Sequence, residues 1–197
     1  MFPRQTGSAR TTGLLAALVA VAAVALTGCG SSGKSNDQGS SSSVSNSSGA
    51  GSSTGSVTFN DVTVDGATDL ANKPKVTSKS SSAPAALEVK DLVTGDGTAA
   101  TPTSSVTVQY VGVLYADGKQ FDASWDHGGA LNFSLQQVVA GFTQGIGGNQ
   151  QVAPMKVGGR RIMILPAALG YGAGGTPDGS VPPNAPLVFV VDLVGVS

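Results

Sequence analysis

Two strongly apolar runs near the end of the chain, separated by a loop rich in glycine and proline, most constrain its fold. The runs cover residues 160–165 and 187–194, and Tyr171 lies in the loop between them. Apolar runs of this length, bounded by turn residues, favour β-strands. Alternate positions of the second run give one continuous apolar face, formed by Leu187, Phe189, Val191 and Leu193.

β-Branched residues and turn signals predict further strands earlier in the chain. They cover residues 87–93, 106–114, 119–124 and 131–135. Asp117-Gly118, between the second and third of these, is a strong hairpin signal. In the second strand Val106, Val108 and Tyr110 share one face, because successive side chains of a strand point to opposite sides.

One short helix is predicted between the strands. The residues spaced for one face of this helix are Val138, Val139, Phe142 and Ile146. Gly141 lowers the helix propensity of the segment. Several antiparallel strands with a single short helix predict an α+β fold, in which an antiparallel β-sheet wraps around the helix.

Residues 1–29 are similar to the signal peptide of a bacterial lipoprotein. Arg4 and Arg10 precede an apolar run over 14–26, which is short for crossing ~30 Å of hydrocarbon at ~1.5 Å per residue. The tetrapeptide Leu-Thr-Gly-Cys that ends at Cys29 resembles a lipobox, in which the cysteine is lipidated. The alternative is an ordinary secretory signal with a chance cysteine. We expect export and a lipid-anchored, outward-facing location at the cell membrane.

The composition of the chain changes twice after this segment. Residues 30–56 are dominated by serine and glycine, and such a segment buries too little apolar surface to fold, so a flexible tether is predicted. Residues 57–86 are predicted to be an extended approach segment, with a weak strand over 57–64 and too few residues for a second domain. The folded domain is then expected over 87–197.

Composition excludes several classes of function. A single cysteine cannot form a disulfide framework or a multi-cysteine metal site, and we expect no cofactor and no metal. The formal net charge is -1, without the basic patch that nucleic-acid binding requires. His127, the only histidine, is interpreted as a loop residue. The G-x-G-x-x-G pattern at 170–175 is not followed by a helix, which argues against a dinucleotide site.

Five blocks of sequence, in matching order and spacing, resemble the FKBP family of macrolide-binding peptidyl-prolyl isomerases. The blocks are Tyr110-x-Gly112, Asp117-Gly118-Lys119-x-Phe121-Asp122-x-Ser124, Val138-Val139-x-Gly141-Phe142, Lys156-Val157-Gly158-Gly159-Arg160-Arg161, and Tyr171-Gly172 with Pro182-Pro183-Asn184-Ala185 and Leu187-Val188-Phe189. The resemblance covers roughly residues 87–197. It implies an FKBP-like fold and a monomeric chain.

The resemblance also implies roles for eight residues. Those expected to line an apolar cup for the proline ring are Tyr110, Phe121, Val138, Val139, Phe142 and Phe189. Asp122 and Tyr171 are expected at the polar rim as catalytic residues. The Asp122 carboxylate would orient Tyr110 or respond to the twisting amide, while Tyr171 and the backbone N–H of Val139 would donate to the substrate. Without the resemblance, the apolar residues would be interpreted as core and Asp122 as a turn or capping residue.

Four features depart from the family pattern. Phe142 stands where the family usually has tryptophan, and Leu131 stands where an aromatic residue is frequent. The segments 147–154 and 174–180 are longer than usual. These departures bear on the catalytic rate and on macrolide affinity rather than on binding of the ring.

Together these features predict an exported, lipid-anchored prolyl isomerase. It would act on X-Pro bonds of extracytoplasmic polypeptides, assist their folding, and accept macrolide inhibitors. The alternative from another class is a non-catalytic binding module or holdase that uses the same cup to grip chains. A third interpretation is a structural lipoprotein in which the domain is only a scaffold.

Overall fold

The structure, a computed structural model, describes residues 55–197. Its strands are β1 (Ser56–Phe59), β2 (Val62–Asp65), β3 (Lys75–Ser78), β4 (Glu88–Val93), β5 (Ser105–Leu114), β6 (Gln120–Ala123), β7 (Leu131–Ser134), β8 (Arg160–Leu165) and β9 (Leu187–Val196). One α-helix, α1 (Ala140–Gly147), and two 3₁₀ helices, η1 (Ser124–His127) and η2 (Ala167–Leu169), accompany them. The predicted signal peptide, Cys29 and the tether up to residue 54 lie outside the described residues.

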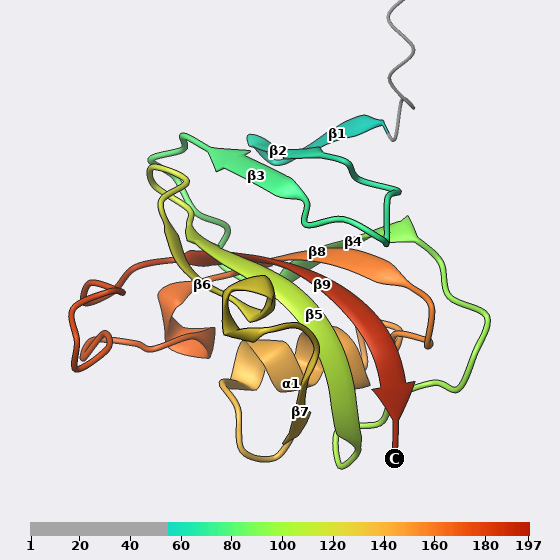
Figure 1. Ribbon diagram of the computed structural model, residues 1–197. Helices are drawn as coiled ribbons and strands as arrows, with labels where there is room; N and C mark the ends of the chain where they lie inside the picture. The colour runs from blue at the N-terminus through green and yellow to red at the C-terminus, as the bar shows by residue number, and fades with distance from the viewer. Residues whose placement is uncertain (1–54) are drawn as a thin grey trace, which may run out of the picture. The chain divides into compact units, whose positions relative to one another are not determined.

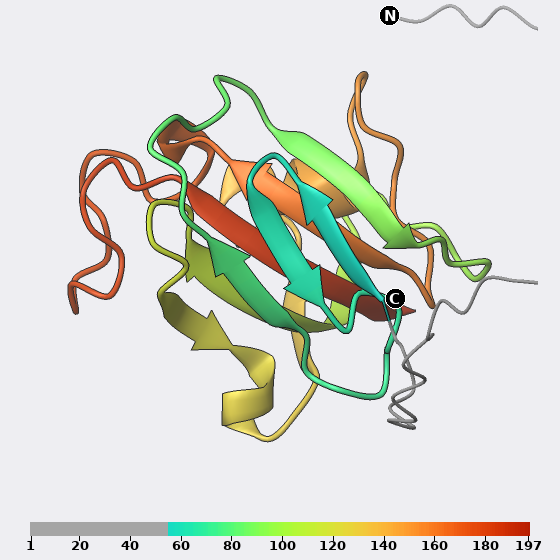
Figure 2. The ribbon, with the colours of Figure 1, turned by 90° about the horizontal axis from the view of Figure 1, so that it is seen from above.

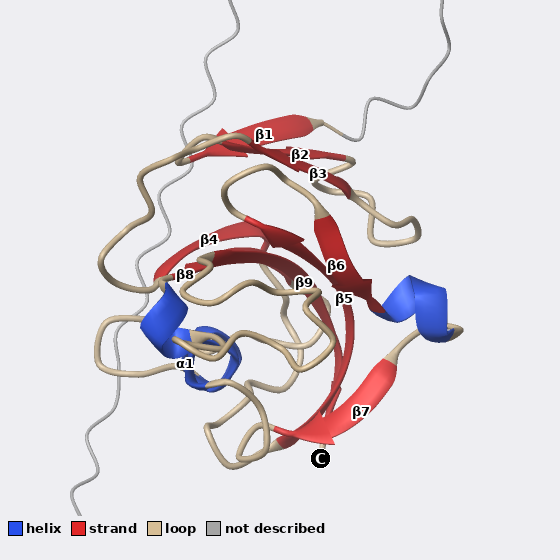
Figure 3. Ribbon diagram, turned by 90° about the vertical axis from the view of Figure 1, so that its left-hand side faces the viewer, coloured by secondary structure: helices blue, strands red, loops and turns tan. Residues whose placement is uncertain are grey.

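A six-stranded antiparallel sheet forms the centre of the domain (Figure 1). Its order is β4-β8-β9-β5-β6, and β7 pairs with β5 beside this path. The two longest strands, β5 and β9, pair from Val106 with Val196 to Leu114 with Leu187. The sheet curves around α1 (Figure 3), so the predicted α+β fold is confirmed.

The inner, concave face of the sheet packs on α1. Phe142 and Ile146 of the helix are buried there, among side chains from β5, β8 and β9. A Cβ atom at Gly141 would lie 2.4 Å from Leu165, and one at Gly145 would lie 2.3 Å from Met163. The glycine that lowers helix propensity is therefore required for the helix to approach β8. The helix begins at Ala140, so the prediction that Val138 and Val139 lie on its face is wrong.

The outer, convex face of the sheet is covered by a second sheet of order β1-β2-β3 (Figure 2). Val62 and Val64 of β2 are fully buried in this layer. The cluster that they join includes Val111, Val113, Ile162, Ile164, Val188 and Val190 of the larger sheet. In place of the extended approach predicted over 57–86, the chain forms a three-stranded layer between Ser56 and Ser78.

The single weak strand predicted over 57–64 is in fact two strands, β1 and β2, which a tight turn separates. Asn60 and Asp61 both have positive φ, 46° and 62°, as both central residues of a type I′ hairpin turn require. Phe59 and Val62 pair across this turn. Asparagine and aspartate tolerate that backbone conformation better than most residues. The turn lacks the glycine of the strongest hairpin signals, so the sequence pattern hides it.

Arg160 of β8 joins the large sheet to the outer layer. Its side chain is fully buried, and its guanidinium donates to Asp192 at 2.5 and 2.6 Å. It also donates to the carbonyl oxygens of Gly66 at 2.7 Å and Asn72 at 3.3 Å, both in the connection between β2 and β3. A buried guanidinium needs such partners, because removing one partner of a buried pair typically costs ~3–5 kcal/mol.

Arg161 makes the corresponding contacts on the inner side of the sheet. It forms a two-pronged contact with Asp91, at 2.6 and 3.0 Å. It also donates to the carbonyl oxygens of Gly145 in α1 and Ala153 in the following loop, at 2.8 and 2.7 Å. The Arg160-Arg161 pair therefore fixes both layers that cover the sheet.

Across residues 55–197, no helix has the length and apolarity needed to span a membrane.

Candidate active site

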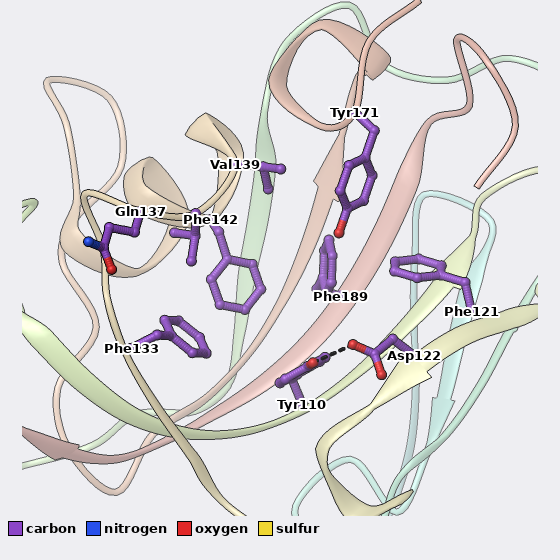
Figure 4. Close-up of a pocket in the computed structure, with 10 residues that line it drawn as sticks. Tyr110, Phe121, Asp122, Phe133, Gln137, Val139, Phe142, Tyr171 and Phe189 are labelled. Atoms are coloured by element: carbon purple, nitrogen blue, oxygen red, sulfur yellow. Dashed lines mark hydrogen bonds between the residues drawn. The ribbon is translucent and has the colours of Figure 1, made fainter. Parts of the chain in front are cut away.

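A cavity of about 320 Å³ opens on the inner face of the large sheet, beside α1 (Figure 4). Most of its wall is aromatic or aliphatic, and Asp122 is its only charged member. The lining residues are Tyr110, Phe121, Asp122, Phe133, Gln137, Val138, Val139, Phe142, Tyr171 and Phe189. All eight residues predicted for the site are therefore brought together around one cavity, while their catalytic and binding roles stay predictions.

Phe189 of β9 is the centre of an aromatic cluster. Its ring centroid lies 5.0 Å from that of Phe142, 5.5 Å from that of Phe121 and 6.2 Å from that of Tyr110. The rings meet edge to face, at interplanar angles between 61° and 90°. Such pairs contribute ~0.5–1.5 kcal/mol each beyond the burial of their area. The rings thus hold one another in place and give the cavity a fixed shape.

Gly112 makes room for these rings. A Cβ atom there would lie 2.7 Å from Phe121 and 2.9 Å from Phe189. Because Gly112 lies on β5 two residues after Tyr110, the short motif Tyr110-x-Gly112 places one ring in the wall and removes an obstacle to two others. Phe142 also lines the cavity, and its ring lies 5.6 Å from that of Phe133.

Two polar side chains stand at the rim. The hydroxyl of Tyr110 donates a hydrogen bond to Asp122 Oδ2, a contact through which this carboxylate can orient Tyr110. Burial, and then the hydrogen bond to Asp122, raise the pKa of Tyr110 well above its usual range. Burial, followed by the charges of Asp122 and Asp178, also raises the pKa of Tyr171. Both phenols therefore stay protonated near neutral pH and can donate.

Two donors remain available to a ligand. Tyr171 is 39% exposed, and Figure 4 shows its side chain pointing into the cavity. Within residues 55–197 its hydroxyl has no hydrogen-bond partner. The same holds for the backbone N–H of Val139, which precedes α1, while the Val139 carbonyl accepts from the N–H of Phe142 at 2.9 Å. These donors can bind two carbonyl oxygens of an extended peptide.

Sequence reasoning missed three residues of the site. Phe133 and Gln137 line the cavity; Phe133 lies on a predicted strand, and Gln137 directly precedes predicted Val138. His127 is not in a loop but ends η1, where its Nε2 atom lies 2.8 Å from Asp122 Oδ1. No residues of the described part form a group of three or more histidine, cysteine, aspartate or glutamate side chains suited to a metal ion.

Comparison with known proteins places this site in a family. The model of the FKBP-type peptidyl-prolyl cis-trans isomerases matches residues 96–194, half of the chain. The chain belongs to this family. Its match contains every lining residue of the cavity and both rim residues. The predicted membership of the FKBP family is therefore confirmed.

Similar relatives agree with this assignment. An FK506-binding protein of Streptomyces anulatus is 45% identical over 126 residues, which are 63% of this chain and 97% of that protein. The crystal structure of AtFKBP13 is matched with a TM-score of 0.54 and 34% identity, over 59% of this chain and 98% of that one. FkpA from Escherichia coli is matched in its crystal structure with a TM-score of 0.50 and 36% identity, over 61% of this chain and 51% of FkpA.

Proposed function

We propose that this FKBP-type chain isomerises X-Pro bonds of polypeptides outside the cytoplasm and thereby assists their folding. The observation that carries the proposal is the cavity itself, a rigid aromatic cup with one carboxylate and two unused donors at its rim. Cavities of ~300–1,000 Å³ hold small ligands, so this one suits a single ring and its neighbouring backbone. Such a cup also suits the apolar ring of a macrolide inhibitor.

The reaction fits a site without a nucleophile or metal. Rotation about a peptide bond breaks no covalent bond, and its barrier of ~18–20 kcal/mol comes from amide resonance. Uncatalysed X-Pro exchange takes ~10–100 s. A catalyst needs to hold the ring, exclude water and bind the twisted amide more tightly than the planar one. Here the aromatic wall would hold the ring, while Val139 N–H and the Tyr171 hydroxyl would fix the carbonyl groups beside it.

Exchange of a short X-Pro peptide, followed by NMR with the folded domain present, tests this activity. We expect wild-type protein to accelerate exchange. Asp122→Val removes the rim charge with little change in volume, and should lower kcat/KM about tenfold, or ~1.4 kcal/mol. Binding of a proline peptide should change less, because the carboxylate acts mainly on the twisted state. Exchange no faster than without protein, with peptide binding retained, would favour the holdase instead.

The place of action rests on the sequence of residues 1–29. The positive segment, the apolar run and the tetrapeptide ending at Cys29 support a lipid-anchored protein at the outer side of the cell membrane. Cys29→Ala should abolish lipid labelling and release the protein from the membrane fraction, because acyl chains contribute ~0.8 kcal/mol per buried CH₂. Ser32→Ala is the matched control and should stay labelled. A Cys29→Ala protein that stays in the membrane fraction would contradict the lipoprotein assignment.

A further inference from the structure

The only histidine of the chain contacts the rim carboxylate of the cup. His127 ends η1, the short helix that follows β6 (Figure 3). Its Nε2 atom lies 2.8 Å from Oδ1 of Asp122, while Oδ2 of the same carboxylate accepts from Tyr110. The carboxylate is thus held from two sides, by a phenol inside the cup and by an imidazole at its outer edge.

The helix that carries His127 is itself anchored. The hydroxyl of Ser124, its first residue, accepts from the backbone N–H of Tyr110 at 2.9 Å and donates to Gln109 at 2.6 Å. Gly128 ends the helix with a φ of 92°, in the left-handed region that glycine adopts at low cost. The imidazole is 55% exposed, but it extends from a backbone that these contacts hold in place.

Two further charges lie near His127, one on the helix itself and one facing it. Asp126 precedes His127 and pairs with Lys73, at 2.9 Å, from the connection between β2 and β3. Asp126 also accepts from Gln120 of β6 at 2.7 Å. The imidazole contacts the carboxylate of Asp122, whereas the carboxylate of the neighbouring Asp126 is already compensated by Lys73. Protonation of the imidazole would chiefly strengthen its bond to Asp122.

We propose that His127 is a positioning residue for prolyl isomerisation, which holds the Asp122 carboxylate more firmly when protonated than when neutral. The inference rests on the proposed function. A protonated imidazole adds the attraction of a positive charge to the hydrogen bond that a neutral imidazole already makes with the carboxylate, and histidine is the side chain whose charge changes between about pH 5 and 8. The activity of the cup should therefore be highest at the acid end of this range. The tyrosines of the cup keep their protons throughout it.

Two substitutions distinguish the effect of a positive charge at residue 127 from the effect of a neutral hydrogen-bond donor there. His127→Arg keeps a permanent positive charge and a donor, whereas His127→Gln keeps a neutral donor. We would measure kcat/KM on an uncharged, blocked X-Pro peptide at about pH 5.5 and about pH 8, relative to uncatalysed exchange at each pH. Wild type should lose about threefold between the two values. His127→Arg should keep the acid value at both, and His127→Gln should show the lower value at both.

The controls distinguish positioning from stability. Melting temperatures of both variants, measured at both pH values, show whether the domain stays folded, and rescue by arginine alone would not follow from a purely structural role. Because the chain has one histidine, its imidazole NMR signal is identified without assignment. That signal should shift at fixed pH in Asp122→Asn, which removes the charged partner, and an unchanged signal would overturn the contact.

The outcomes differ for this inference and for the function on which it rests. A wild-type protein that catalyses with the same pH profile as His127→Gln, or whose activity rises with pH, overturns the role of His127 alone. A wild-type protein that does not accelerate exchange at either pH overturns the proposed function, and this inference with it.

Discussion

Both faces of the large sheet are apolar, but they are covered to different extents. On the outer face, β2 packs over Val111, Ile162 and Val190, which are almost completely buried. On the inner face, α1 has only eight residues and covers part of the sheet. The aromatic rings of β5, β6 and β9 that it leaves uncovered line the cavity. The site therefore arises from an incomplete cover over an ordinary sheet face, whereas the complete cover supplies stability.

The largest effect expected from this contrast is loss of the outer cover. A chain that begins at residue 87 would expose a face whose buried members include Ile162, Ile164 and Val188. Each such side chain contributes ~1.5–3 kcal/mol when fully buried, so the loss over this face is comparable to the ~5–15 kcal/mol by which a domain is stable. We expect this chain to be unfolded or insoluble, as judged by NMR and thermal unfolding.

A chain that begins at residue 55 is the matched control for this truncation. It retains all three strands of the outer layer and should melt cooperatively. If the chain beginning at residue 87 folded with the same melting temperature, the outer layer would not contribute to the stability of the domain.

Substitutions on opposite faces should separate stability from activity. Ile164→Ala opens a cavity in the outer layer and should lower the free energy of unfolding by ~2–5 kcal/mol, with kcat/KM of the folded fraction changed less than about twofold. Phe189→Ala, at the centre of the cup, should lower it by ~3–5 kcal/mol and also abolish most activity. Denaturant unfolding and peptide exchange measure both. Equal loss of activity in the two variants would show that the faces are not independent.

Alkaline pH should act through the cup. The pKa values of Tyr110 and Tyr171 are raised in the folded state, so the folded protein keeps protons that the unfolded chain releases from about pH 10 upward. The free energy of unfolding should be unaffected by these groups below about pH 10 and should fall above it, by at most ~1.4 kcal/mol per pH unit and group. Tyr110→Phe should lessen this fall, as measured by urea unfolding. A fall of the same steepness in Tyr110→Phe would contradict a role for this phenol.

The smallest effect concerns the rim. Tyr171→Phe removes a hydroxyl without an intramolecular partner in the described part of the chain, so the melting temperature should stay nearly unchanged. Affinity for a proline peptide or a macrolide should fall by the value of one hydrogen bond, ~0.5–1.5 kcal/mol, measurable by calorimetry. A large loss of stability would instead make Tyr171 part of the scaffold.

Sequence alone predicted the inner face better than the outer one. The hairpin and the cup residues follow from local patterns and from family motifs, which fall within residues 96–194. The outer layer lies before that region, and the Asn60-Asp61 turn interrupts its alternation. A usable signal was present, because Val188 and Val190 are as apolar as their inward-facing neighbours. A strand that is apolar on both sides indicates a cover on both sides.

The contacts between side chains were harder to predict than the identity of the residues that form the site. Gly141 argues against a helix until the close approach of Leu165 is known. His127 and Asp122 are five residues apart, and only the turn of η1 brings their side chains together. Side-chain contacts across such turns depend on backbone angles that residue types alone do not fix.

The position of β1 has a consequence for how the cup meets its substrates. β1, which begins at Ser56, belongs to the outer layer, while the residues that line the cavity lie on the inner side of the large sheet. A domain attached through the residues that precede Ser56 would therefore be attached on the side opposite the cavity. The cavity would then stay accessible to a proline-containing ligand that approaches from the opposite side.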